Sequence, residues 1–286
     1  MGRVTRRYPV LRLRSGAVTR APDTVAVEEP LEIRLNGESF QVTMRTPGHD
    51  IDLVHGLLHS EGIICESADV VLARYCEGAG PDGLNTYNVV DVSLRDGLAP
   101  TAGLARNVLT TSACGICGTA SVDQVRQRSR YAPDPDFRVV PDVVLAGPQR
   151  LRAEQRTFDK TGGLHAAGLM TADGQMLCVR EDVGRHNAVD KVIGWALRAG
   201  RLPLAHTLLC VSARASFELT QKAVLAGIPL LAAVSAPSSL AVELAEESGL
   251  TLVGFIRNDG MNIYSHPDRV GLHESREPVG TASPTC

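Results

Sequence analysis

The sequence lacks both a long hydrophobic run and an excess of either charge. No window approaches the roughly 18 uninterrupted apolar residues that a membrane-spanning helix needs. The apolar stretch at residues 8–11 is ended by Arg12 and is too short for a signal peptide. The net charge is −3, so no broad attraction to nucleic acid or to a membrane surface is expected. These absences predict a soluble, cytoplasmic protein with no nucleic acid or membrane partner.

The sequence is also too poor in cysteine for a protein held together by disulfides. Its seven cysteines are an odd number, scattered over 286 residues, which argues against a disulfide framework and favours a reducing compartment. Cys178 and Cys210 lie in apolar runs and are predicted to be small core residues. Cys114 and Cys117 form a CxxC pair, and we expect the chemistry of the protein to depend on their thiols.

Length and composition predict two domains. With 44% hydrophobic residues, the chain can form one large core and a smaller one. We expect a flexible N-terminal arm at residues 1–27, an α+β domain at 28–140 that carries a flexible CxxC loop at 110–119, an α/β domain at 141–272, and a flexible tail at 273–286. The proline-rich stretch at 132–135, followed by Pro141, is interpreted as the region between the domains.

The first domain is expected to begin with a β-hairpin. Apolar residues alternate on both sides of Asn36-Gly37, a dipeptide typical of a tight hairpin turn. Asp50 is expected to cap a helix that ends at Gly62. Further strands are predicted near residues 70–75 and 87–94.

In the second domain, predicted strands and helices alternate. This order favours a layered α/β sheet with largely parallel strands. The strands are expected at residues 164–169, 176–179, 204–211, 230–234 and 252–256, and the helices at 188–196, 217–225 and 240–245.

Small and polar residues follow four of these strands, at residues 181–187, 212–216, 235–239 and 257–260. Ligands of such sheets bind beyond the carboxyl ends of the strands, where free N–H groups at helix N-termini attract phosphate. Each segment alone is equally typical of ordinary helix capping, but four on one edge favour a pocket. The three lysines of the chain adjoin these segments or residues 161–165, either as ligand contacts or as solvated helix positions; they are Lys160, Lys191 and Lys222.

The CxxC pair is compatible with several kinds of site. A zinc site needs a second pair, and Cys65 and Cys76 have a poor spacing for one. A thioredoxin-like centre should follow the first strand of a βαβ unit, whereas this pair lies in a glycine-containing loop well into the chain. An inert structural pair is a further alternative. We favour a nucleophilic thiol that accepts and passes on a group such as a persulfide sulfur.

Over residues 28–270 the chain resembles the FdhD family of formate dehydrogenase accessory sulfurtransferases. The resemblance rests on seven motifs: EPL at 29–31, MRTPG at 44–48, CGIC at 114–117, TGGLH at 161–165, EDVGRHNAVDK at 181–191, SFEL at 216–219 and GFIR at 254–257. One departure is Ala213, where glycine is usual in the family, and we expect alanine there to tighten the backbone.

The resemblance implies a sulfur carrier. Such a protein takes sulfur from an IscS-type cysteine desulfurase as a persulfide on Cys114, with Cys117 assisting or resolving the transfer. It delivers the sulfur to the molybdenum cofactor, bis-molybdopterin guanine dinucleotide, before that cofactor enters formate dehydrogenase. No structural metal is expected. The resemblance also implies a homodimer and a three-layer αβα C-terminal domain similar to cytidine deaminases.

The expected cofactor contacts come from the family's cofactor-binding stretch and from the strand ends. They are Phe255, Ile256, Arg257, Asn258, Asp259, Gly260, Arg185, His186, Ser212 and Arg214, with His165 as a further candidate.

Deamination itself is not expected. Deaminases have a general-acid glutamate two residues after a zinc-binding histidine, and here Ala188 follows His186 at that spacing. Residues 212–214 also lack the later cysteines. Two other functions stay open: a non-catalytic chaperone for the molybdenum cofactor, and dithiol redox exchange.

Overall fold

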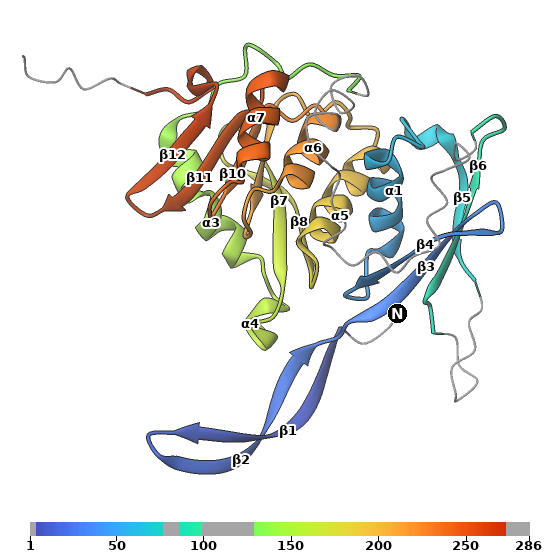
Figure 1. Cartoon of the computed structure of the whole chain (residues 1–286), viewed down its shortest axis with the longest axis vertical. Coiled ribbons are helices and arrows are strands. Elements are labelled where there is room, and N and C mark those ends of the chain that lie inside the picture. Colours follow the sequence, from blue (N-terminus) through green and yellow to red (C-terminus); the bar gives the residue numbers. More distant parts are fainter. Residues whose placement is uncertain (1–3, 77–85, 99–128, 273–286) are drawn as a thin grey trace, which may run out of the picture.

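The structure is a computed structural model that describes residues 4–76, 86–98 and 129–272 (Figure 1). The CxxC loop, with Cys114 and Cys117, and the tail at 273–286 lie outside the described residues. Within the described ranges, no helix is long and apolar enough to cross a membrane.

A four-stranded sheet with the order β4-β3-β6-β5 forms the first part of the body. Its elements are β3 (Glu29–Leu35), β4 (Glu38–Arg45), α1 (Asp50–Ser60), a 3₁₀ turn (Ser67–Asp69), β5 (Val70–Tyr75) and β6 (Val89–Leu94). The hairpin predicted at Asn36-Gly37 is confirmed: both residues have positive φ, at 51° and 87°, as the tight turn between β3 and β4 requires. Leu31 and Ile33 of β3 are buried in one cluster with Leu53 of α1.

A six-stranded sheet with the order β12-β11-β10-β9-β7-β8 forms the second part. Its elements are α3 (Pro141–Ala153), α4 (Phe158–Thr161), β7 (His165–Thr171), β8 (Met176–Asp182), α5 (Arg185–Arg198), β9 (Thr207–Val211), α6 (Phe217–Leu225), β10 (Leu230–Ala233), α7 (Ser239–Ser248), β11 (Thr251–Arg257), β12 (Gly260–Ser265) and a 3₁₀ turn (Pro267–Arg269).

The prediction of a largely parallel sheet was wrong. Among the described strands of this sheet, only β9 with β10 and β10 with β11 pair in parallel, whereas β7 is antiparallel to both of its neighbours and β12 is antiparallel to β11. Short turns between β7 and β8 and between β11 and β12 leave no room for a crossover helix, so these pairs form hairpins. Because two antiparallel pairings separate β8 from β9, these strands still run in the same direction. The carboxyl ends of β8, β9, β10 and β11 therefore share one edge.

Helices cover both faces of this sheet, as expected for a three-layer αβα arrangement. On one face, α5, α6 and α7 bury Val189, Leu219 and Leu244 in one cluster with the sheet residue Leu231. On the other face, α3 buries Val144 in a cluster with sheet residues such as Leu208. Strands buried on both sides are apolar throughout, which is why β9 and β10 read as continuous hydrophobic runs.

Helix α1 joins the two sheets by crossing α5 at two glycines. A Cβ atom at Gly56 would clash with the carbonyl of Asp190, and one at Gly194 would clash with the carbonyl of Asp52. Glycine at both positions therefore lets the two helix backbones approach closely. The two parts of the chain share this packed interface, and the domain boundary proposed at residue 140 stays a prediction.

One segment was predicted wrongly as irregular. Residues 1–27 contain a hairpin of β1 (Thr5–Arg14) and β2 (Ala17–Ala26) instead of an irregular arm. Pro141, placed at the start of the second domain, is the first residue of α3. The sequence did not predict this hairpin, because both of its faces are largely exposed to solvent. Burial therefore imposes no alternation of apolar and polar residues along β1 and β2. Proline at the first helical position lacks only an N–H that would be unpaired there.

Candidate functional site

The four polar segments predicted beyond the strands do meet at one edge of the six-stranded sheet. The N–H of Phe255 donates to the carbonyl of Ser235 (3.3 Å), and that of Ser238 donates to Ala215 (3.0 Å). The N–H of Ser212 donates to Ala166, the second residue of β7. These bonds link the residues that follow β9 and β10 with the last part of β11 and with the start of β7, which the antiparallel pairing places at the same edge.

Two helix N-termini at this edge are not capped by the side chain of their own N-cap residue. Helix α5 begins after Gly184, which has no side chain, and α6 begins after Ser216, whose hydroxyl does not cap the helix. By contrast, Ser238 accepts a hydrogen bond from Ala241 at the start of α7. Uncapped N–H groups and the positive end of the helix dipole favour an anion at the first turns of α5 and α6.

Two buried polar atoms beside these helix starts also lack partners. The hydroxyl of Ser216 and the Nε of Arg185 are buried and make no hydrogen bond within the described part of the chain. A buried polar atom without a partner is costly, and a ligand oxygen would satisfy both. The donors therefore fit the phosphate groups of a ligand.

The histidines at this edge have different environments. Burial, and then the charges of Arg185 and His186, lower the pKa of His165, so His165 is neutral near pH 7. His186 lies 2.7 Å from Glu218 (Nε2 to Oε2), and the hydrogen bond from His186 holds the pKa of Glu218 below its usual range. His186 is thus already engaged by a carboxylate, whereas the Nε of Arg185 has no partner among the described residues.

The predicted contacts in β11 and β12 are only partly available to a ligand. Ile256 is 2% exposed and packs in the core on the α3 side, so only its backbone could contact a cofactor. Phe255 is 40% exposed and has a φ of 52°, at an irregularity in the pairing of β11 with β12. Arg257, Asn258 and Asp259 are exposed at the turn between these strands.

The strand end after β9 has a structural role as well. The hydroxyl of Ser212 accepts the N–H of Ala166 (2.9 Å) and so fastens β7 to β9, while Arg214 is exposed. Ala213 is buried, and its φ is not in the left-handed region. Alanine therefore fits at this position without backbone strain, and the tightened backbone expected there is not observed.

Lys191 and Lys222 form ion pairs within the protein and are not solvated helix positions. Lys191 is 1% exposed, and its Nζ lies 2.6 Å from Asp182 and 2.9 Å from the carbonyl of Thr46. Lys222 pairs with the buried Asp190 (2.7 Å), and Lys160 is exposed. A sequence signal for Lys191 did exist, because it stands among the apolar helix positions 188, 189, 192 and 193.

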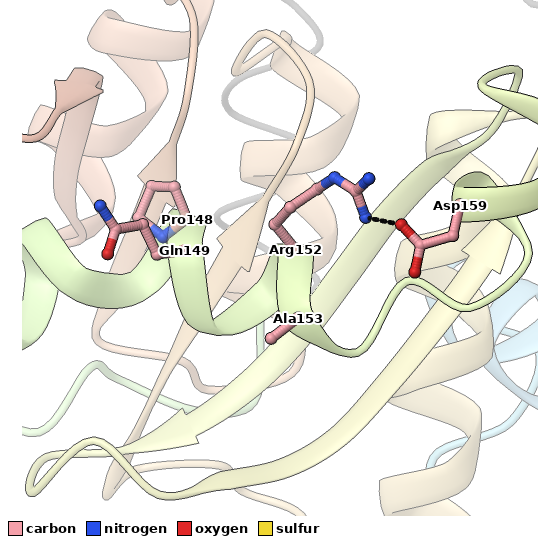
Figure 2. A pocket seen from close by; sticks show the side chains of 5 residues that line it. All are labelled: Pro148, Gln149, Arg152, Ala153 and Asp159. Atoms are coloured by element: carbon pink, nitrogen blue, oxygen red, sulfur yellow. Dashed lines mark ion pairs between the residues drawn. The ribbon is translucent and has the colours of Figure 1, made fainter.

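A shallow hollow lies along α3, apart from the helix starts (Figure 2). It is lined by Pro148, Gln149, Arg152, Ala153 and Asp159. Arg152 and Asp159 form an ion pair of 2.6 Å across it. Gln149 donates a hydrogen bond to Asn258 (2.9 Å), so the hollow adjoins the turn between β11 and β12.

The four cysteines in the described ranges differ in their exposure to solvent. Cys178 and Cys210 are buried, as expected, and burial raises their pKa to about 11 and about 12. Cys65 and Cys76 are partly exposed. In the described ranges, no group of three or more His, Cys, Asp and Glu side chains could hold a metal ion. The CxxC pair lies outside those ranges.

The fold, together with the helix starts at one edge of the six-stranded sheet, defines an α/β protein with a site that attracts anions beyond the ends of its strands. The FdhD/NarQ family model matches residues 26–271, so the chain belongs to the FdhD/NarQ family.

Relatives and a solved structure agree with this assignment. The "Sulfur carrier protein FdhD" of Streptomyces coelicolor is 60% identical over 275 residues, covering 95% of this chain and 98% of the relative. That of Mycolicibacterium paratuberculosis is 60% identical over 270 residues, covering 94% and 99%. A crystal structure from Desulfotalea psychrophila, provisionally described as a formate dehydrogenase accessory protein, shares the fold, with a TM-score of 0.73, 23% identity and coverage of 94% and 100%.

Proposed function

We propose that this protein is a cytoplasmic sulfur carrier that serves formate dehydrogenase through the molybdenum cofactor. It accepts sulfur from a cysteine desulfurase on Cys114 and transfers it to bis-molybdopterin guanine dinucleotide, with the cofactor as its substrate. It works as a homodimer. Relatives at 60% identity that are named sulfur carrier proteins support the first half of this proposal.

One structural observation carries the cofactor half of the proposal. The starts of α5 and α6, with the Ser216 hydroxyl and the Arg185 Nε, which have no partner in the described part of the chain, form a set of donors for phosphate. A guanine dinucleotide presents phosphate oxygens, which are the acceptors that such donors require.

The sulfur half of the proposal follows from thiol chemistry. The thiolate of Cys114 attacks the outer sulfur of the desulfurase persulfide, which forms a new S–S bond on Cys114 and releases the desulfurase cysteine as a thiolate. Attack by the thiolate of Cys117 on the Sγ of Cys114 then releases the carried sulfur as a sulfide nucleophile and leaves a Cys114–Cys117 disulfide. A cellular dithiol reductant restores the pair for the next cycle.

Mass spectrometry of the intact protein tests sulfur carriage. After incubation with a cysteine desulfurase and cysteine, the wild type should gain about 32 Da, reversible by reduction, as expected for one sulfur on a thiol. Cys114→Ala should abolish the adduct, and Cys65→Ala is the matched control that should keep it. An adduct that persists on Cys114→Ala would refute the assignment of the carrier thiol.

Nucleotide binding tests the cofactor site. With guanosine diphosphate as the probe, Ser216→Ala and Arg185→Gln should each weaken binding about tenfold, because each removes a donor to a charged oxygen. Ser248→Ala, whose hydroxyl donates to Leu244 at the other end of α7, is the control and should bind normally. Unchanged affinity in both site variants would refute the site. The cofactor chaperone is the alternative, and binding without any sulfur adduct would favour it.

A further inference from the structure

The hairpin of β1 and β2, here called the arm, has no support from the rest of the described chain over most of its length. Among the described strands, these two pair only with each other, and Figure 1 shows the arm projecting away from the body. Its base touches α4. A two-stranded hairpin standing alone in water is marginally stable at best, so the arm requires a surface to pack against.

One face of the arm is apolar near its tip. Leu13 pairs with Val18 across the hairpin, and Leu11 lies two residues from Leu13 on the same face. These three side chains are 69%, 64% and 68% exposed. Arg7 and Arg20 lie on this same face and border a shallow hollow of the arm. An exposed apolar cluster with a charged rim is typical of a protein interface.

The charge of the arm is opposite to that of the remaining chain. Residues 1–27 contain six arginines and one acidic residue, a net charge of +5, and the whole chain has −3, so residues 28–286 carry −8. Part of this negative charge lies on α7, which exposes Glu243, Glu246 and Glu247 and contains no lysine or arginine. The body of a second copy therefore attracts the arm.

We propose that the arm is an interaction surface for a second copy of this chain, with the acidic face of α7 as its receiving surface. Two copies exchange arms about a twofold axis, so that each arm covers the body of its partner. Packing of arm against arm is disfavoured because both carry +5. Nucleic acid is disfavoured because the body carries −8 and repels a long polyanion.

The size of the arm is sufficient for a stable contact. Ten-residue strands span about 33 Å, and two strands are about 10 Å wide. Two reciprocal contacts, counted on both partners, therefore bury about 1,300 Å², within the range of stable interfaces. This inference rests on the homodimer of the proposed function and not on sulfur transfer, because sulfur loading of Cys114 is measured separately.

The test is the oligomeric state of the full chain by sedimentation equilibrium. The wild type should be a dimer, and Leu11→Ser with Leu13→Ser should raise the dimer dissociation constant at least about a hundredfold, because the exposed leucines lose their contact. Val71→Ser with Leu72→Ser is the matched control, since these β5 residues are 69% and 48% exposed but lie outside the arm. Unchanged thermal unfolding of the arm variant would show that its body is folded.

A charge exchange tests the receiving surface. Arg7→Glu with Arg20→Glu should weaken the dimer, as should Glu243→Lys with Glu247→Lys, and combining all four should restore it in part. A monomeric wild type, or an arm variant that dimerises like the control, would overturn the proposal. If the Glu243→Lys, Glu247→Lys variant has the same dimer dissociation constant as the wild type, the assignment of α7 as the receiving surface is overturned.

Discussion

Replacing Lys191 by methionine removes the buried cation that joins the two sheets. The ammonium group donates to the carboxylate of Asp182 (2.6 Å) and to the carbonyl of Thr46 (2.9 Å). Asp182 is fully buried and also accepts N–H bonds from Thr46 (3.1 Å) and Gly184 (2.8 Å). Methionine keeps most of the apolar stem, so the change isolates the charge.

The structure predicts a large loss of stability from this single change. Removing one partner of a buried ion pair costs about 3–5 kcal/mol, because the other charge stays buried without compensation. Here the remaining N–H donors partly compensate the charge of Asp182, so we expect the free energy of unfolding to fall by about 3 kcal/mol. In a chain of this size each kcal/mol lowers the melting temperature by about 2–4 °C, which predicts a decrease of roughly 6–12 °C.

Urea unfolding followed by circular dichroism measures this loss. Asp182→Asn combined with Lys191→Met should be about 1–2 kcal/mol more stable than Lys191→Met alone, because the uncompensated charge is gone. Lys160→Met, at an exposed position, is the control and should change stability by less than about 0.5 kcal/mol. If Lys191→Met costs less than about 1 kcal/mol, the ion pair does not hold the two sheets together and the reasoning fails.

Three further predictions follow from buried groups. Burial lowers the pKa of His59, so the contribution of His59 to the free energy of unfolding should be constant above about pH 7.5. This contribution should fall as the pH drops below the unfolded value of about 6.5. His59→Gln should flatten that slope in urea titrations, and an unchanged slope would count against this cause. Gly194→Ala should destabilise the protein by more than about 3 kcal/mol, because the added methyl group clashes with the carbonyl of Asp52. Gly271→Ala, with open space around it, is the control and should have little effect. Equal melting temperatures of the two variants would disprove the close crossing of α1 and α5. Cys210, whose pKa burial raises to about 12, should react with iodoacetamide only in denaturant, and labelling of the native protein at neutral pH would contradict its burial.

Local sequence patterns predicted most of the regular elements. Asn36-Gly37 specifies a hairpin because both residues tolerate positive φ, and the predicted helix at 217–225 has the bounds of α6. These elements could be predicted because their signals lie within a few neighbouring residues. Burial of Cys210 was likewise evident from the apolar strand around it.

The candidate site was predicted in outline only. The four polar segments were expected at one edge, and they meet there even though the sheet is mixed, because β8 runs in the same direction as β9. Which groups remain free for a ligand was not predictable. Both Arg185 and His186 follow β8, yet His186 is engaged by Glu218, 32 residues away in the chain, while Arg185 keeps an unpartnered donor.

The sequence by itself determined the family motifs, the turns and the apolar strands and helices, because each depends on residues close together in the chain. Only the tertiary structure decided that Lys191 is a buried ion-pair partner, that Ile256 faces the core, and that the N-terminal arginines lie on a projecting hairpin. Such outcomes depend on which distant segments come into contact, and in this chain Thr46, directly after β4, meets Asp182 of β8 and Lys191 of α5.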